Sequence, residues 1–386
     1  MTILRNICEK LLTQAPKPVL LLSQLCPALM KYHSDSDNEL ERLLGLNGLK
    51  VIRFDEQISV FTDSIRRPTV FRVLVSDGKW RRYVVKSGEP LKVDASAQRV
   101  RIAITHCGYT VTQLTDDCGI IEYLEDHVRI RDMIESATSR HLLSGVLESS
   151  IKPIEDEIIL TPAQVLRQKY EDNCSKVPSH CLRSAIEEKC CSMQDFIMKK
   201  QKFENTLVQM TLISSLLGLG DRHLENIMYS LRDGGVCCVD WAAIFKYGVG
   251  ELPAARLTRN FVAVCNTQAL ESGLQNAVTM LRKSERLFAA CISMSFKWMD
   301  QEFKKKEPYI RKFLNGETAS HEITKDMVLK STKKYKEKYL QLLEEVFVDY
   351  EGLQFYSVID QVSSLLRMST DPRVLALTRP QWEPWI

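Results

Sequence analysis

The sequence predicts an α+β protein in which a small region rich in β-strands precedes a larger helical region. Two observations indicate this order. Between Val51 and Val85, short runs of alternating apolar and polar residues are separated by turn signals at Arg67-Pro68 and Asp77-Gly78. Beyond Asp126, apolar residues instead recur at the spacing of amphipathic helices.

The composition is that of an ordinary globular protein. Of the 386 residues, 45% are hydrophobic and 26% are charged, which excludes disordered and collagen-like architectures. The 52 Lys and Arg residues nearly balance the 49 Asp and Glu residues, so charge alone does not support a nucleic-acid or membrane surface. No apolar run approaches the roughly 20 residues that cross a bilayer, and none has the form of a secretory signal. The 12 cysteines form no C-x-x-C pair, and we expect free thiols in an intracellular protein.

Each element is predicted from a local pattern. Residues 1–47 are expected to be helical, with one apolar face before a break at Pro16 and Pro18 and a second apolar stretch after it. Strands are predicted at 51–55, 58–60, 70–74 and 82–84, and after a short connection at 110–114 and 120–123. Amphipathic helices are predicted at 128–134, 162–170 and 192–205.

The segment from 206 to 239 combines a buried helix with a hairpin. Residues 206–217 are apolar almost all round, and Gly218 and Gly220 end that helix. The runs 226–231 and 236–239 flank Asp233-Gly234-Gly235, which supplies the positive φ that a tight turn needs. The lysine clusters at 304–306 and 333–338 lie on helical sequence and are interpreted as solvated helix faces.

The sequence G-L-G-D-R-H-L-E-N at 218–226 is the segment that indicates chemistry. Asp221 and Asn226 have the D-x-x-x-x-N spacing of a kinase catalytic loop, in which a carboxylate meets the substrate hydroxyl and an amide oxygen meets the metal. The hairpin then leads to Asp240, a candidate second metal ligand. Taken singly, each of these residues is more common as a surface-loop or capping residue. Together they predict phosphoryl transfer, although His223 follows the aspartate here, whereas ordinary protein kinases have H-R-D.

With these motifs in place, the chain resembles the phosphatidylinositol 3-kinase-related protein kinases. The resemblance covers roughly residues 50–265 and 355–386 and rests on segments spread over both ranges: F-D-E at 54–56, S-I-R-R-P at 64–68, V-K-S-G-E-P-L-K-V-D at 85–94, G-I-I-E-Y-L-E at 119–125, G-L-G-D-R-H-L-E-N at 218–226, R-L-T-R at 256–259, T-D-P-R-V-L at 370–375 and W-E-P-W-I at 382–386. It implies a bilobal protein-kinase-like fold with an N-lobe at 48–125, a C-lobe at 126–345 and a small FATC domain with its helix at 354–386.

The resemblance also implies a role for each matching residue. Lys86 would bind the ATP phosphates, and Glu89 and Asp94 would orient it. The loop over the phosphates would include Ser64, Ile65 and Arg66, and the hinge that meets adenine would be Glu122, Tyr123 and Leu124. Asp221 would accept the proton from the substrate hydroxyl, His223 would stabilise the transferring phosphoryl group, and Asn226 and Asp240 would hold the metal.

The activity so implied is ATP-dependent phosphorylation of protein Ser/Thr with Mg²⁺ as cofactor. The S-I-R-R-P and W-E-P-W segments favour the branch that acts in the nucleus in DNA double-strand break repair by non-homologous end joining. That branch implies partnership with the DNA-end-bound Ku heterodimer, through regions outside this chain, and no membrane.

Three departures from the family pattern keep other interpretations open. The stretch between Asp94 and Tyr109 is shorter than the helix that the family places there, Trp241-Ala242 replaces Phe-Gly after Asp240, and the activation segment before Arg256 is short. The alternatives are a pseudokinase or interaction module that retains the fold, a fragment of a larger kinase chain, and a lipid kinase. The FATC-like end argues against a lipid kinase.

Overall fold

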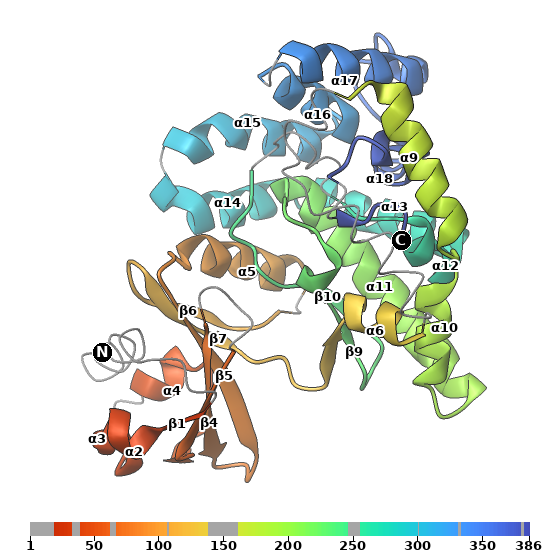
Figure 1. The fold of residues 1–386 in the computed structure, drawn as a ribbon. Coiled ribbons are helices and arrows are strands. Elements are labelled where there is room, and N and C mark those ends of the chain that lie inside the picture. Colours follow the sequence, from red (N-terminus) through yellow and green to blue (C-terminus); the bar gives the residue numbers. More distant parts are fainter. Residues whose placement is uncertain are drawn as a thin grey trace. The chain divides into compact units, whose positions relative to one another are not determined.

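The computed structural model describes residues 19–32, 39–61, 67–105, 108–137, 161–245, 255–299, 301–330, 333–379 and 382–386. The chain divides into two compact units between Glu125 and Asp126. Unit 1 is built on a β-sheet and unit 2 is mainly helical (Figure 1). The predicted fold class is therefore confirmed. The predicted outer limits of the domains and the FATC identity of the last helix remain predictions.

In its described residues, unit 1 contains one antiparallel sheet, three short helices and one longer helix. The sheet has the order β1-β3-β4-β5-β7-β6, and β2 also pairs with β4. Its strands are β1 (Val19–Leu21), β2 (Val51–Phe54), β3 (Gln57–Val60), β4 (Thr69–Val75), β5 (Trp80–Ser87), β6 (Val111–Thr115) and β7 (Cys118–Glu122). The described helices are α2 (Leu22–Leu25), α3 (Pro27–Met30), α4 (Glu39–Leu43) and α5 (Lys92–Thr105). On the core side of the sheet, Phe71 stacks between Phe54 and Tyr83, with ring centroids 5.9 and 5.5 Å away.

The strands at 51–60, 69–87 and 111–122 confirm the predicted strand region, but two predictions for unit 1 were wrong. Val19–Leu21 is a strand paired with β3, because the alternation around Leu20 buries that side chain against the sheet. The connection between β5 and β6 contains the 14-residue helix α5. Ala95, Ser96 and Ala97 are buried on it, and side chains this small give only a weak apolar period in the sequence. The predicted helix face around Leu4 and Leu11 lies outside the described residues.

Unit 2 carries a small sheet, β8 (His127–Arg129), β9 (Ile227–Ser230) and β10 (Val236–Cys238), in the antiparallel order β10-β9-β8. Its earlier helices are α6 (Ile130–Ala137), α9 (Ala163–Lys176), α10 (Cys181–Glu188), α11 (Met193–Leu217), η2 (Leu224–Asn226), α12 (Arg259–Val264) and α13 (Thr267–Lys283). Its later helices are α14 (Glu285–Phe296), η3 (Lys297–Met299), α15 (Gln301–Asn315), α16 (Ser320–Val328), α17 (Lys333–Val346), η4 (Val348–Tyr350), α18 (Val358–Thr370) and α19 (Pro372–Leu375).

Helix α11 and the hairpin that follows it form the support of the site. The helix begins where the Ser192 hydroxyl accepts the amide N–H of Asp195, and it ends where Gly218 adopts a left-handed φ of 57°. In the hairpin turn, Gly234 has a φ of 82°, and a Cβ there would lie 2.5 Å from the Lys199 carbonyl oxygen. Only glycine fits this approach, so the hairpin packs directly on α11.

Two helix predictions for unit 2 need correction, and the others are confirmed. Residues 127–129 are a strand, because β8 pairs with β9 and the helix α6 begins only at Ile130. The helices predicted at 192–205 and 206–217 are one continuous helix, since no residue between them interrupts the backbone ladder. No helix in the described part of the chain is long and apolar enough to cross a membrane. The described cysteines are free thiols, as predicted.

Candidate functional site

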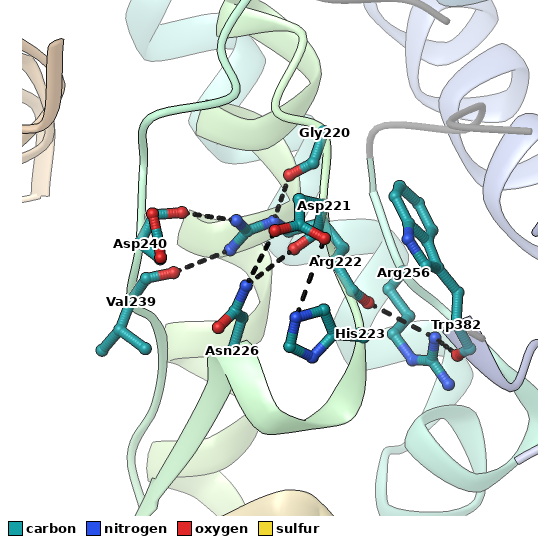
Figure 2. Close-up of polar contacts among 9 residues, drawn as sticks. All are labelled: Gly220, Asp221, Arg222, His223, Asn226, Val239, Asp240, Arg256 and Trp382. Atoms are coloured by element: carbon teal, nitrogen blue, oxygen red, sulfur yellow. Dashed lines mark hydrogen bonds and ion pairs between the residues drawn. The ribbon is translucent and has the colours of Figure 1, made fainter. Parts of the chain in front are cut away.

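The loop between Leu219 and Asn226 brings the predicted catalytic residues of unit 2 together (Figure 2). The Asn226 amide nitrogen donates to the Asp221 carbonyl oxygen at 3.1 Å and to its carboxylate Oδ2 at 3.3 Å. His223 Nε2 lies 3.7 Å from Asp221 Oδ1. The D-x-x-x-x-N spacing therefore places an amide against the carboxylate that is the candidate base.

Arg222 holds this loop to the segment that carries Asp240. Its side chain is buried, at 1% exposure. Nε donates to the Gly220 carbonyl at 2.6 Å, while Nη1 and Nη2 donate to the carbonyls of Val239 and Asp240 at 3.1 and 2.6 Å. A guanidinium fork matches such a fan of acceptors because its N–H groups are fixed in one plane. Arg222 thus sets the distance between the loop and Asp240 through their backbones (Figure 2).

Asp221 and Asp240 both adopt the left-handed backbone region, with φ of 54° and 57°. Aspartate tolerates this region better than most residues, but it is still uncommon outside glycine. Such conformations persist where surrounding contacts fix them, and they cluster at functional sites. The Arg222 hydrogen bonds and the Asn226 amide supply the fixing contacts here.

The surroundings of His223 favour a neutral imidazole. Burial lowers the pKa of His223, and the carboxylate of Asp221 opposes that shift without cancelling it. A neutral ring presents one N–H donor and one acceptor nitrogen. His223 can therefore donate a hydrogen bond to a phosphoryl oxygen, in the way that a preorganised donor stabilises developing charge.

The donor set of unit 2 fits Mg²⁺. Because the Asn226 amide nitrogen is turned to Asp221, its oxygen faces away from that residue and is available as a ligand. Asp240 supplies a carboxylate. Among the described residues no cluster of three or more His, Cys, Asp or Glu side chains forms a complete cage. One or two protein oxygens completed by phosphates and water are what Mg²⁺ takes in nucleotide sites.

The predicted phosphate-binding residues of unit 1 lie on β5 and α5. Lys86 is on β5 opposite Gly119 of β7, and its Nζ lies 3.3 Å from Glu89 Oε1. A Cβ at Gly119 would lie 2.5 Å from the Thr112 carbonyl, so only glycine fits beside the lysine strand. Asp94 is in the first turn of α5 and is 2% exposed. Lys86 and Glu89 are thus brought together, as the resemblance implies.

The predicted hinge residues follow β7. The Glu122 carboxylate accepts the amide N–H of Thr110 at 2.9 Å, and the Tyr123 N–H donates to the Arg82 carbonyl. The Arg82 guanidinium covers the Tyr123 ring at 4.1 Å and pairs with Glu125. A nucleotide base could therefore stack only on the face of the Tyr123 ring that lies opposite Arg82. Leu124 is half-buried, and Ser64, Ile65 and Arg66 lie outside the described residues.

Arg222, Arg256, Arg131 and Glu383 are site residues to which sequence analysis gave no role. Arg222 and Arg256 lie inside the quoted segments G-L-G-D-R-H-L-E-N and R-L-T-R. Only Arg256, between Ala255 and Leu257, gives the signal of a charged residue with apolar neighbours. Arg256 is 6% exposed and donates to the carbonyls of Arg222 and Trp382 (Figure 2). Their partners come from distant segments, so no local pattern predicts them.

Comparison with known proteins gives a family match and several individual relatives. The sequence model of the phosphatidylinositol 3- and 4-kinase family matches residues 89–301. The chain is 24% identical over 257 residues to the DNA-dependent protein kinase catalytic subunit of Dictyostelium discoideum, covering 54% of this chain and 6% of that protein. It is 22% identical to the serine-protein kinase ATM of Sus scrofa, covering 83% of this chain and 12% of that protein. The chain thus spans about a tenth of the length of these curated relatives.

Among solved structures, the chain is similar to one described as the FAT and kinase domain of CtTel1. The TM-score is 0.67 at 15% sequence identity, and the match covers 98% of this chain and 28% of that chain. At this identity the match shows a shared fold.

Proposed function

Because the chain belongs to the phosphatidylinositol 3- and 4-kinase family, we propose that it transfers the γ-phosphoryl group of ATP to serine or threonine hydroxyls of proteins. The relatives it matches are phosphatidylinositol 3-kinase-related protein kinases, which confirms the resemblance drawn from the motifs. Membership of the family makes a phosphotransferase the activity class. The protein Ser/Thr acceptor, the use of ATP with Mg²⁺ and the role in DNA repair are what we propose.

One observation supports the proposal most strongly: the Asn226 amide meets the Asp221 carboxylate on a loop that Arg222 fastens to Asp240. Phosphoryl transfer asks the protein mainly for positioning and for electrostatic stabilisation. Asp221 would orient the substrate hydroxyl and accept its proton. His223 would donate its N–H to the transferring group, and Asn226 and Asp240 would hold Mg²⁺, which supplies positive charge next to the phosphates.

In unit 1, Lys86 would contact the phosphates and Glu89 would orient it, consistent with their 3.3 Å separation. Glu122, Tyr123 and Leu124 would contact adenine, and Asp94 would support Lys86 from the first turn of α5. The finer proposal is a kinase of the DNA-dependent type, acting in the nucleus in double-strand break repair with Ku. It is supported by the relatives' names and by the S-I-R-R-P and W-E-P-W segments.

The test is the choice of acceptor. Purified chain is incubated with Mg-ATP and, separately, with a Ser/Thr peptide library and with vesicles that contain phosphatidylinositol. We expect phosphoserine and phosphothreonine, with no phosphorylated lipid. Lipid phosphorylation would overturn the acceptor assignment, and ATP binding without transfer to either acceptor would favour a pseudokinase.

A further inference from the structure

The segment Trp382–Ile386 packs into unit 2 and is held there by two arginines of the R-L-T-R segment. Trp382, Glu383 and Trp385 are each less than 5% exposed. Arg256 donates to the carbonyl oxygens of Trp382 and Glu383, the second at 2.7 Å. Arg259 donates to the Trp385 carbonyl at 2.7 Å. Buried carbonyl groups are therefore satisfied by charged donors, which form the stronger class of hydrogen bond.

The same guanidinium reaches the catalytic loop. Arg256 Nη1, which donates to Trp382, also lies 3.4 Å from the carbonyl oxygen of Arg222. That carbonyl belongs to the peptide unit that leads into His223 (Figure 2). A displacement of Arg256 would therefore shift the peptide group between Arg222 and His223.

The side chain of Glu383 makes a second link to the loop through Arg131 of α6. Glu383 is 1% exposed, and its Oε1 lies 3.3 Å from Arg131 Nη1. Arg131 Nε lies 3.7 Å from the carboxylate of Glu225, which is in η2 between His223 and Asn226. The two links meet the loop at different points, at the Arg222 carbonyl and at the Glu225 side chain.

The buried carboxylate of Glu383 lies next to two positively charged side chains, Arg131 and Arg256. Burial lowers the pKa of Arg256 to about 10, and the Glu383 carboxylate opposes that shift. Burial raises the pKa of Glu383, which Arg131 and Arg256 oppose in turn. Removing one partner of a buried charge pair leaves the other uncompensated, and this is costly. Glu383 also has a left-handed φ of 50°, a strained conformation that its contacts must maintain.

We propose that Glu383 is a positioning residue for phosphoryl transfer, whose carboxylate, acting through Arg131 and Arg256, holds the loop 221–226 in its competent arrangement. The inference rests on the proposed function of that loop. Glu383 touches neither of the candidate metal ligands in the contacts described above, so its effect is on the rate of transfer and leaves nucleotide affinity nearly unchanged.

The experiment compares Glu383→Gln, which keeps the size and removes the charge, with Glu383→Asp, which keeps the charge. Exposed Glu351 supplies the matched control, Glu351→Gln. For each variant of the 386-residue chain we measure Mg-ATP affinity, the single-turnover rate of peptide phosphorylation and amide hydrogen exchange in 219–226. Glu383→Gln is expected to lower the rate at least about tenfold and speed exchange in the loop, with affinity within about twofold. Glu383→Asp should recover part of both losses.

A double variant tests the route. If Glu383 acts through Arg131, then adding Arg131→Gln to Glu383→Gln should lower the rate less than the two single effects combined. An unchanged rate and unchanged loop exchange in Glu383→Gln would overturn the proposal. So would equal loss in Glu383→Asp and Glu383→Gln, which would show that packing and not charge matters. A wild-type chain that transfers no phosphate would instead refute the proposed function. In that case, the hydrogen exchange of 219–226 in Glu383→Gln would still show whether Glu383 holds the loop.

Discussion

Arg222 lies between Asp221 and His223, which are proposed to take part in phosphoryl transfer, and its own role is to position the loop that carries them. Three carbonyl groups from two segments of the chain accept hydrogen bonds from its guanidinium. Lysine could not reproduce this, because a single ammonium group has no fixed fork of donors. The sequence pattern D-R-H gives no sign of these partners, since two of them lie in the segment after the hairpin.

Asp240 is the residue through which metal dependence can be tested. Asn tolerates its left-handed φ of 57°, so Asp240→Asn should keep the local backbone while removing the ligand charge. We expect the Mg²⁺-dependent part of ATP affinity to fall roughly tenfold or more. Calorimetric titration of ATP with and without Mg²⁺ measures it.

The matched control is Asp233→Asn in the hairpin turn, where the side chain accepts the N–H of Gly235 and an amide oxygen can do the same. This variant should bind Mg-ATP as the wild type does. Equal Mg²⁺ dependence in the wild type and in Asp240→Asn would remove Asp240 from the metal site.

Among the elements, α5 shows how packing decides what a sequence pattern leaves open. The family pattern led us to expect a shortened support for Lys86, yet a 14-residue helix begins at Lys92, ahead of Asp94. Ala95, Ser96 and Ala97 are buried because small side chains let the helix lie close to its neighbours. A helix that carries Asp94 in its first turn is therefore present, and its shortening relative to the family stays a prediction.

The helices α16 and α18 enclose a histidine that makes the stability of unit 2 depend on pH. His321 Nδ1 lies 2.8 Å from the Ser364 hydroxyl, and its ring stacks on Phe347 with centroids 4.6 Å apart. Burial lowers the pKa of His321 to about 4, and nearby Lys325 adds to that effect. Below the unfolded pKa of roughly 6.5, the unfolded chain binds a proton that the folded chain does not.

The free energy of unfolding should therefore fall as the pH drops from about 6.5 to about 4, by as much as ~3 kcal/mol from this group. Urea unfolding at several pH values measures the slope. His321→Gln keeps a hydrogen-bonding side chain without a titrating ring and should flatten that part of the curve. His180→Gln, at an exposed position, should leave the curve unchanged. A wild-type curve that is flat between these pH values would contradict the prediction.

At the scale of the whole molecule, local patterns predicted most elements and missed the contacts between distant ones. The strands of unit 1 and the hairpin at 226–239 follow from alternation and from Asp233-Gly234-Gly235, which are local signals. Asp221 and Asn226 were predicted from their spacing, and the structure brings them together. The contacts of Arg256 with Trp382 and Glu383 join residues more than 100 positions apart, and no spacing rule reaches that far.

If the loop 218–226 carries out phosphoryl transfer, the single-turnover rate of Asp221→Asn at saturating Mg-ATP should show it. Asn fits the left-handed φ of 54°, and its amide oxygen can still accept from Asn226, so the loop should keep its shape. We expect the rate to fall by about 10² or more, as for loss of a positioned acid-base group, with ATP affinity within about twofold of the wild type. A variant that phosphorylates peptide within roughly threefold of the wild-type rate would rule out Asp221 as the base. Asp221 would then be a structural residue of the loop, and the transfer would need another base.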